Sequence, residues 1–138
     1  MQFELINQLE SDSKSTKVSP KKTTLDYMYY LERVSDSCYL AVMLYAMAPC
    51  PWTYYVISSA LDRQNIKLEI LKQWIRFYSS KESLKQVTSI RGLLDKLAIN
   101  SSEEKKRDMK NYFSISCKHE LEFWNMAHSY NINEGKAI

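Results

Sequence analysis

Residues 39–52 read YLAVMLYAMAPCPW. Wound as a helix, residues 39–47 are apolar on nearly every side, so we expect this segment to lie at the centre of the molecule. Pro49 disfavours helical geometry at Ala48 and is expected to end or kink the helix there. Pro51 suits the first position of a helix, so the sequence predicts a new helix from residue 51 to about residue 63.

The segments around this one have the periodicity of amphipathic helices. Apolar side chains recur at helical spacing within residues 24–34, 66–78, 81–98 and 101–130. The best-marked helix start is Ser101-Ser102-Glu103-Glu104, which has the pattern of a capping box. No strand is predicted, so the fold class expected from the sequence is all-α, a helical bundle.

Composition excludes several other classes of protein. The 138 residues include only 2 glycines, too few for the tight turns of sandwiches, barrels and nucleotide-binding α/β folds. A net charge of +3, with the lysines scattered and no basic recognition helix, does not indicate nucleic-acid binding. No apolar run reaches the length of a membrane span, and the longest, residues 39–48, ends at the prolines. We therefore expect no nucleic acid and no membrane among the partners.

The chain is expected to divide at residue 23. Residues 1–10 have the pattern of a short helix and are followed by a polar, Ser- and Lys-rich loop, whereas residues 24–138 form the helical domain. The first residues lack the pattern of a signal peptide. Three cysteines without CxxC spacing predict neither a disulfide framework nor a metal site. These features favour a reducing, cytoplasmic location.

Glu120 is the first candidate for chemistry. It falls on the apolar stripe of the last predicted helix, three or four residues from Ser116 and Phe123, whereas Glu122 falls on the polar side. A carboxylate on a core stripe must be paired, protonated or used, and desolvation suits it to general acid catalysis. The alternative is a structural role, with Glu120 hydrogen-bonded to a buried tyrosine.

Cys50 is the second candidate. Between two prolines it is expected at the N-cap of the restarted helix, where free N–H groups and the helix dipole would lower the pKa of its thiol and favour a nucleophile. The alternative is a small buried hydrophobic residue. Cys38 and Cys117 have no such context and are interpreted as packing residues.

Aromatic side chains supply a third element. Tyr54 lies one turn after Cys50, and Tyr27, Trp74 and Tyr78 lie on predicted buried faces, so they could line a pocket for a flat heteroaromatic ligand. A plain role in the core is the alternative. The two histidines, His119 and His128, do not share a metal-binding spacing, and His119 falls on the polar side of its helix, so neither is given a role.

Three segments, PCPWTYY at 49–55, WIRFY at 74–78 and ELEFWNMA at 120–127, together resemble the TenA/thiaminase II family. Their order and spacing hold from about residue 27 to residue 130. The resemblance implies an all-helical, haem oxygenase-like fold and hydrolysis of aminopyrimidines in thiamin salvage. It also implies that no cofactor is needed and that the protein is a homo-oligomer, in most members a tetramer.

The resemblance also implies roles for single residues. Cys50 matches the nucleophile that adds to the pyrimidine ring, and Glu120 matches the acid that protonates a ring nitrogen. Tyr27, Tyr54 and Tyr78 match pocket tyrosines that orient the ring and tune the thiol. Phe123 matches a side chain that packs against the substrate.

The sequence also departs from the family. Its members are longer at the N-terminus, and the aspartate that binds the pyrimidine's amino group lies in helices absent here; neither Asp12 nor Asp26 matches it. Pro51 stands where an aromatic residue is usual. Two functions therefore stay open. One is aminopyrimidine hydrolysis with a second chain completing the site. The other is a non-catalytic helical oligomer or pyrimidine-binding protein. In both we expect association, with copies of this chain or with a separate N-terminal-half chain.

Overall fold

The computed structural model describes residues 19–37 and 39–133, and the helix predicted over residues 1–10 lies outside them. Within the described residues the regular structure is helical. In chain order the helices are α2 (Lys22–Ser37), α3 (Leu40–Met47), α4 (Pro49–Leu61), α5 (Glu69–Tyr78), α6 (Lys81–Ile99) and α7 (Glu103–Asn133). The all-α prediction is confirmed for this part of the chain, and the predicted helix ends fall within a few residues of those observed.

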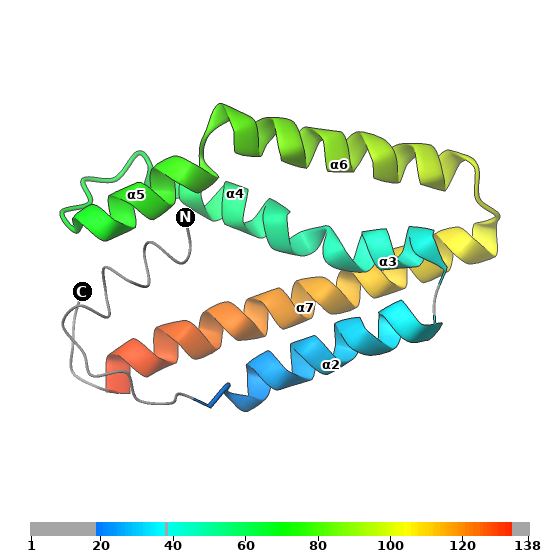
Figure 1. Ribbon diagram of the computed structural model, residues 1–138, viewed down its shortest axis with the longest axis horizontal. Coiled ribbons are helices and arrows are strands. Elements are labelled where there is room, and N and C mark those ends of the chain that lie inside the picture. The colour runs from blue at the N-terminus through cyan, green and yellow to red at the C-terminus, as the bar shows by residue number, and fades with distance from the viewer. Residues whose placement is uncertain (1–18, 38, 134–138) are drawn as a thin grey trace.

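The long helix α7 organises the bundle (Figure 1). Helices α2, α3 and α4 all pack against α7, and α2 also packs against α3. Helix α6 lies along α3 and α4, whereas α5 packs against α4 near its C-terminal end. The bundle therefore brings α2, α4 and α7, which are far apart in the sequence, around one region of the molecule.

The core lies between α2, α3 and α7. Tyr30, Val34, Val42, Ala46 and Met109 are buried together there, and Val42 and Ala46 come from the segment that the sequence placed at the centre. The hydroxyl of Tyr30 donates a hydrogen bond of 2.8 Å to the carbonyl oxygen of Tyr112, which satisfies its polar end inside the core. This contact fixes α2 to α7.

One of the two proline predictions is confirmed and the other is wrong: α3 ends at Met47, directly before Ala48 and Pro49, but the next helix does not start at Pro51. Ala48 has helical dihedral angles, φ −65° and ψ −33°, and its N–H bonds to the carbonyl of Leu44. Pro49, not Pro51, occupies the first position of α4, so α3 passes into α4 through a single turn residue. The predicted helix start at residue 51 was wrong because the conformational bias before proline is weaker than the packing of this buried segment. Pro49 itself is fully buried.

Serine side chains cap two of the helices. The Oγ of Ser80 accepts a hydrogen bond of 3.1 Å from the N–H of Ser83 at the start of α6. The predicted start of α7 is confirmed, with Ser102 as the cap, since its Oγ accepts from the N–H of Lys105 at 3.3 Å. These bonds satisfy N–H groups that have no partner within the helix.

The consecutive helices α3 and α4 also bear on the membrane prediction. Taken as one stretch, Leu40–Leu61 is long and apolar enough to cross a membrane by length and composition alone, and 28% of its most apolar window is buried. Core helices of bundles meet the same criterion, and this stretch packs against α7 over both of its halves. Its remaining apolar surface is relevant to the partners considered below.

Candidate active site

A cavity of about 170 Å³ lies between α2, α4 and α7. It is lined by Tyr27 from α2, by Cys50 and Tyr54 from α4, and by Glu120 and Phe123 from α7, with Thr24, Met28 and Leu31 completing the wall. Five of the six residues selected from the sequence therefore line one cavity. The sixth, Tyr78, packs behind it, with its ring centroid 4.9 Å from that of Tyr54.

Glu120 lies where its spacing predicted. The residue is 4% exposed, and it follows the buried Ser116 by one helical turn on the same face of α7. The side chain of Glu122 is 63% exposed, as expected for the polar side. Glu120 is the only charged side chain among the described residues that line this cavity, so it sets the electrostatics of the site.

The thiol of Cys50 has a raised pKa, not the lowered one that the sequence suggested. Cys50 is exposed at the surface, but the protein around its sulfur removes part of its water. This desolvation and, next, the nearby carboxylate of Glu120 raise the pKa of Cys50 to about 11. Because Ala48 continues the helix, Cys50 lies within a nearly unbroken helical run and not at a free helix N-terminus. The expected help from the helix dipole is therefore absent, and the thiol is protonated at neutral pH.

Tyr27 presents a polar group to the cavity. Its hydroxyl oxygen is buried and makes no hydrogen bond of ordinary geometry with the described residues. Burial, followed by the charge of Glu120, raises the pKa of Tyr27 well above its usual range. The phenol therefore keeps its proton, and the interaction of its hydroxyl with the Glu120 carboxylate contributes to the raised pKa.

Tyr54 is held from behind by an aromatic cluster. Its ring centroid lies 5.7 Å from that of Trp74, 4.9 Å from Tyr78 and 5.4 Å from Trp124, all in tilted arrangements. Contacts of this kind favour one ring orientation. Burial, then the neighbouring Cys50 and Glu120, raise the pKa of Tyr54 to about 12. Tyr78 thus supports the cavity wall without lining it.

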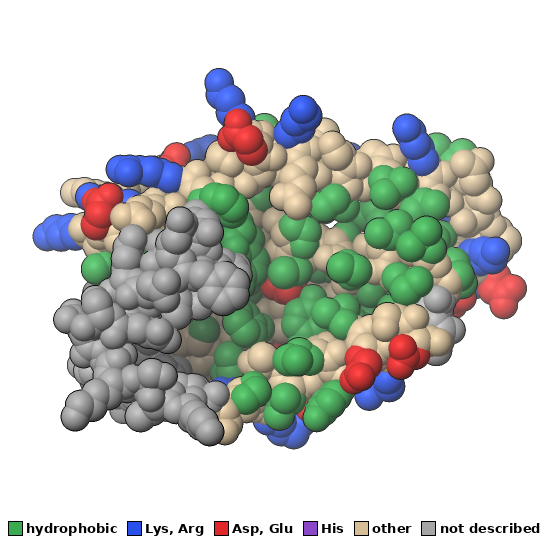
Figure 2. Space-filling model, viewed as in Figure 1, with side chains coloured by type: hydrophobic (Ala, Val, Ile, Leu, Met, Phe, Trp, Pro, Cys, Tyr) green, Lys and Arg blue, Asp and Glu red, His purple; other side chains and the backbone are tan. Residues whose placement is uncertain are grey.

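A larger apolar hollow adjoins the site on the side of α6. It has a volume of about 400 Å³ and shares Tyr27, Leu31 and Cys50 with the first cavity. Leu44, Met47, Ile90, Leu93 and Leu94 supply most of its remaining wall. Figure 2 shows hydrophobic side chains gathered over this face, between α6 and α2. Cys50 therefore lies at the junction of a polar site and an apolar groove.

The structure corrects the sequence interpretation of two residues on α7. His119 is not on the polar side: its side chain is 18% exposed, and its ring stacks on Tyr27. Positions 112, 116, 119 and 123 follow helical spacing, so the sequence alone indicates that His119 borders the buried stripe of this helix. Cys117 is exposed and not a packing residue, because it lies one position, about 100°, round the helix from Ser116. Cys38 lies outside the described residues.

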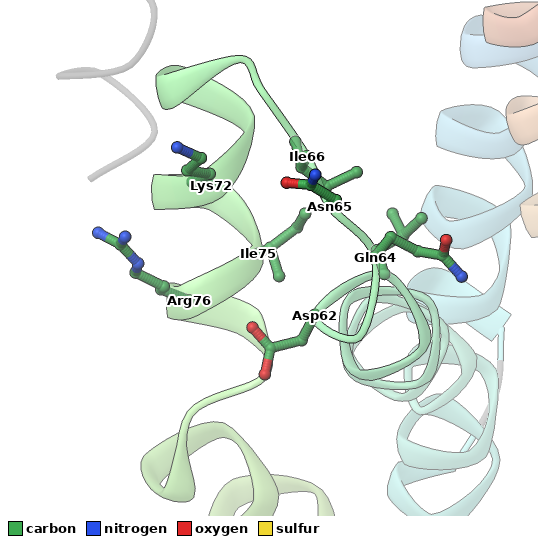
Figure 3. Close-up of a pocket in the computed structure, with 8 residues that line it drawn as sticks. Asp62, Gln64, Asn65, Ile66, Lys72, Ile75 and Arg76 are labelled. Carbon is green, nitrogen blue, oxygen red and sulfur yellow. The ribbon is translucent and has the colours of Figure 1, made fainter.

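A second, polar hollow of about 230 Å³ lies at the far end of α4. Figure 3 shows Asp62 and Gln64 at the end of α4, Asn65 and Ile66 on the following loop, and Lys72, Ile75 and Arg76 on α5. Both cations face the carboxylate of Glu69, at 3.2 Å for Lys72 and 3.7 Å for Arg76. None of the residues selected from the sequence lines this hollow. Among the described residues no group of three or more His, Cys, Asp and Glu side chains could hold a metal ion.

Comparison with solved structures defines the class of fold. The chain superposes on a TenA homologue protein from P. horikoshii OT3 with a TM-score of 0.77 and 24% identity, covering 90% of this chain and 58% of that one. The fold is thus the all-helical, haem oxygenase-like one that the sequence predicted. Residues 4–130 match the model of the TENA/THI-4/PQQC family, and the chain belongs to that family. The match begins well before residue 27, where the sequence motifs start.

Two curated relatives carry the same name, aminopyrimidine aminohydrolase. The chain is 34% identical over 125 residues to an aminopyrimidine aminohydrolase of Bacillus subtilis, which covers 91% of this chain and 52% of that protein. It is 35% identical over 105 residues to an aminopyrimidine aminohydrolase of Staphylococcus saprophyticus, covering 75% of this chain and 44% of that protein. The chain spans about half the length of these relatives.

Proposed function

We propose that this chain takes part in the hydrolysis of an aminopyrimidine for thiamin salvage, with Cys50 as nucleophile and Glu120 as acid. The supporting observation is the single cavity that Cys50, Glu120, Tyr27, Tyr54 and Phe123 line from three helices. The names of the B. subtilis and S. saprophyticus relatives support the same reaction class. A cytoplasmic location belongs to this proposal.

Because the pKa of the Cys50 thiol is raised, the proposed reaction needs Glu120 first as a base and then as an acid. The thiol enters the reaction with its proton, so a base must remove it as sulfur bonds to an electron-poor ring carbon. The Glu120 carboxylate is near enough to raise the pKa of that thiol and is therefore placed to accept the proton. Glu120 then donates the same proton to a ring nitrogen, which receives the electron pair of the ring's double bond.

The remaining steps return the enzyme to its starting state. The substrate's amino group carries its own extra proton as an ammonium group, and the electron pair on the ring nitrogen expels it from the exocyclic methylene carbon as a neutral amine. The water that adds next releases one proton, which balances the one that left with the amine. Water adds to that carbon and forms a hydroxymethyl group. The bond between sulfur and the ring then breaks, and Cys50 regains a proton through Glu120. The sum is substrate plus water giving an alcohol plus an amine.

The aromatic residues orient the ring in this scheme. Tyr27 offers a buried hydroxyl beside the Glu120 carboxylate that makes no hydrogen bond of ordinary geometry, which suits a hydrogen bond to a ring nitrogen or amino group of a ligand. Phe123 offers an apolar face, and Tyr54, supported by Tyr78, closes the wall beside Cys50. Such positioning contributes to catalysis because the reacting atoms are held together.

We also propose that a second polypeptide completes the site. The cavity is open and is continuous with an apolar groove whose residues would otherwise face water. Glu120 is the only charged side chain among the described residues that line the cavity. In this scheme it is committed to the proton transfers, so these residues offer no further carboxylate for the pyrimidine's amino group. A second copy of this chain, seated on the groove, would cover the apolar surface and could supply further polar groups.

The test is release of ammonia from a pyrimidine that carries an aminomethyl substituent. Glu120→Gln, which can neither accept nor donate the proton, is expected to lower kcat by about 10²–10⁴-fold. Cys50→Ser should lose as much, because the weaker nucleophile cannot form the adduct. The matched controls are Glu122→Gln and Cys117→Ser, both at exposed positions, and they should stay within about twofold of the unmodified protein. Equal losses from Glu120→Gln and Glu122→Gln would contradict the assignment of the acid.

The alternative function is pyrimidine binding without turnover. The observation that favours it is the protonated thiol of Cys50, which is a poor nucleophile unless Glu120 acts as its base. Binding of 4-aminopyrimidine with no ammonia release from the aminomethyl substrate, even in the assembled oligomer, would support this alternative and exclude the hydrolase.

A further inference from the structure

His119 lies against two tyrosines of α2. Its ring is nearly parallel to that of Tyr27, with an interplanar angle of 6° and a centroid distance of 5.1 Å. Its distance to the ring of Tyr30 is 4.9 Å, with the planes tilted by 34°. Distances and angles in this range are those of offset-stacked aromatic pairs. The imidazole therefore contacts both tyrosines at once.

Tyr30 makes this group of rings rigid. Its hydroxyl donates to the carbonyl oxygen of Tyr112 at 2.8 Å and accepts from the hydroxyl of Ser116 at 3.3 Å. The residue is 6% exposed and belongs to the core. His119 is thus held between a fixed tyrosine and Tyr27, whose ring is part of the wall of both cavities.

Tyr27 has neighbours at its polar end and on the faces of its ring. Its hydroxyl lies near the Glu120 carboxylate, whose interaction with it helps to raise its pKa, although no hydrogen bond of ordinary geometry forms. The faces of the ring contact aromatic side chains of α2 and α7. The contact with Tyr30 is longer, at 6.4 Å between centroids, and tilted by 31°. The parallel contact with His119 is therefore the closest aromatic contact of Tyr27 among the described residues.

From this geometry we infer that His119 is a positioning residue, whose stacked ring holds Tyr27 in the wall that the two cavities share, with the phenol beside Cys50 and Glu120. His119 does not line either cavity and need not touch the substrate. Its Nδ1 is buried without a hydrogen bond and lies 3.9 Å from a carboxylate oxygen of Glu122. Tyr27 contacts the flat face of the His119 ring and makes no hydrogen bond to it. The expected effect of His119 on catalysis rests on the proposed function, whereas its expected effect on the position of Tyr27 does not.

The experiment compares substitutions that keep or remove a flat ring. His119→Phe retains the stacked face, and His119→Leu has a similar volume without it. The first readout is the rate at which iodoacetamide labels Cys50, measured by peptide mapping. Cys50 is already exposed, so the effect is expected through its pKa and not through access. A displaced Tyr27 lets water solvate the sulfur better and lowers the pKa that desolvation raises, so His119→Leu should raise the labelling rate about three- to tenfold. His119→Phe should stay within about twofold. His128→Leu, at an exposed histidine of the same helix, is the control.

Ammonia release from the aminomethyl pyrimidine is the second readout. His119→Leu should lower kcat about 10- to 100-fold with a smaller change in KM, and His119→Phe should restore most of the loss. If His119→Leu does not fold, His119→Gln, a smaller planar side chain, takes its place and should give an intermediate labelling rate. Equal labelling of Cys50 in the Leu, Gln and Phe variants would overturn the inference. If the labelling rate of Cys50 depends on a ring at position 119 but the protein releases no ammonia, the role of His119 stands and only the proposed hydrolase activity is contradicted.

Discussion

Cys50 and Glu120 act on each other at the scale of single residues. The carboxylate disfavours the thiolate, and the pKa of Cys50 rises to about 11 through this charge and through burial. A nucleophile in this setting depends on the same carboxylate as its base. In the proposed mechanism the pair is therefore one proton-transferring unit and not two independent groups.

The first prediction concerns the reactivity of Cys50. Its labelling by iodoacetamide should be slow at pH 7.5 and should rise with pH towards about 11, since only the thiolate reacts. Glu120→Gln removes the negative charge that raises this pKa. At pH 8 it should speed the labelling of Cys50 about three- to tenfold, because one pKa unit corresponds to about tenfold in thiolate below the pKa. Glu122→Gln is the matched control. Labelling that is unchanged or slower in Glu120→Gln would contradict the coupling.

A second prediction concerns stability in alkali. The folded state raises the pKa of Cys50 from an ordinary 9.0 to about 11 and that of Tyr54 from 10.0 to about 12. The unfolded chain loses these protons first, so it binds fewer protons than the folded one and stability falls as pH rises. The loss should run from about pH 9 to about pH 12. Thermal melting across that range measures it, and Tyr54→Phe combined with Cys50→Ser should flatten the slope. If the unmodified protein and the double variant lose stability with pH at the same slope, Cys50 and Tyr54 are not the cause of the loss.

The sequence could predict Glu120 but not the state of Cys50. A carboxylate on a helical stripe is visible from spacing alone, because Met109, Ser116 and Glu120 follow the period of the helix. The environment of Cys50 depends on whether Ala48 stays helical and on a carboxylate 70 positions away, and neither is local information. His119 was placed wrongly because it lies at the border of the stripe, where only the packing partner decides burial.

At the scale of elements, local signals located the helix starts with side-chain caps. Both Ser80 and Ser102 accept a hydrogen bond from an N–H in the first turn of the following helix. The join between α3 and α4 carries no such cap, since Ala48 at that position is helical and has no polar side chain. There the burial of Val42, Ala46 and Pro49 sets the geometry, and burial depends on helices far along the chain.

The third prediction follows from the cap of α6. Ser80→Ala removes the acceptor for the N–H of Ser83 and should cost about 1 kcal/mol of the free energy of unfolding. For a domain of this size that lowers the melting temperature by roughly 3–5 °C. Ser114→Ala is the control, because the hydroxyl of Ser114 bonds to the Lys110 carbonyl within an exposed helix, where alanine is tolerated or slightly better. A larger loss from Ser114→Ala than from Ser80→Ala would count against the cap.

At the scale of the whole molecule, one face of the bundle is unusually apolar. Met28, Tyr29, Met47 and Leu93 are 45–60% exposed there. They line two grooves, one of about 540 Å³ between α2 and α3 and the adjoining one of about 400 Å³ between α3, α4 and α6 (Figure 2). Extended apolar patches of this kind mark association surfaces in most proteins. The groove nearer α6 includes Cys50, so the proposed association and the proposed catalysis would share this residue.

The last prediction is that this face joins two copies of the chain. The stretch Leu40–Leu61 has no charged side chain, and 28% of its most apolar window is buried within one copy. Covering its exposed apolar surface would therefore favour association. Light scattering at micromolar concentration should therefore give a dimer or a larger symmetric assembly. Met47→Glu places a charge where the two grooves meet and should shift the protein towards monomer, with loss of ammonia release because the site is left open. Leu121→Glu, at an equally exposed leucine of α7 outside both grooves, should leave the assembly intact. A monodisperse monomer that retains full activity would overturn the prediction, and a monomer that becomes active only with a different chain would replace the second copy with that chain.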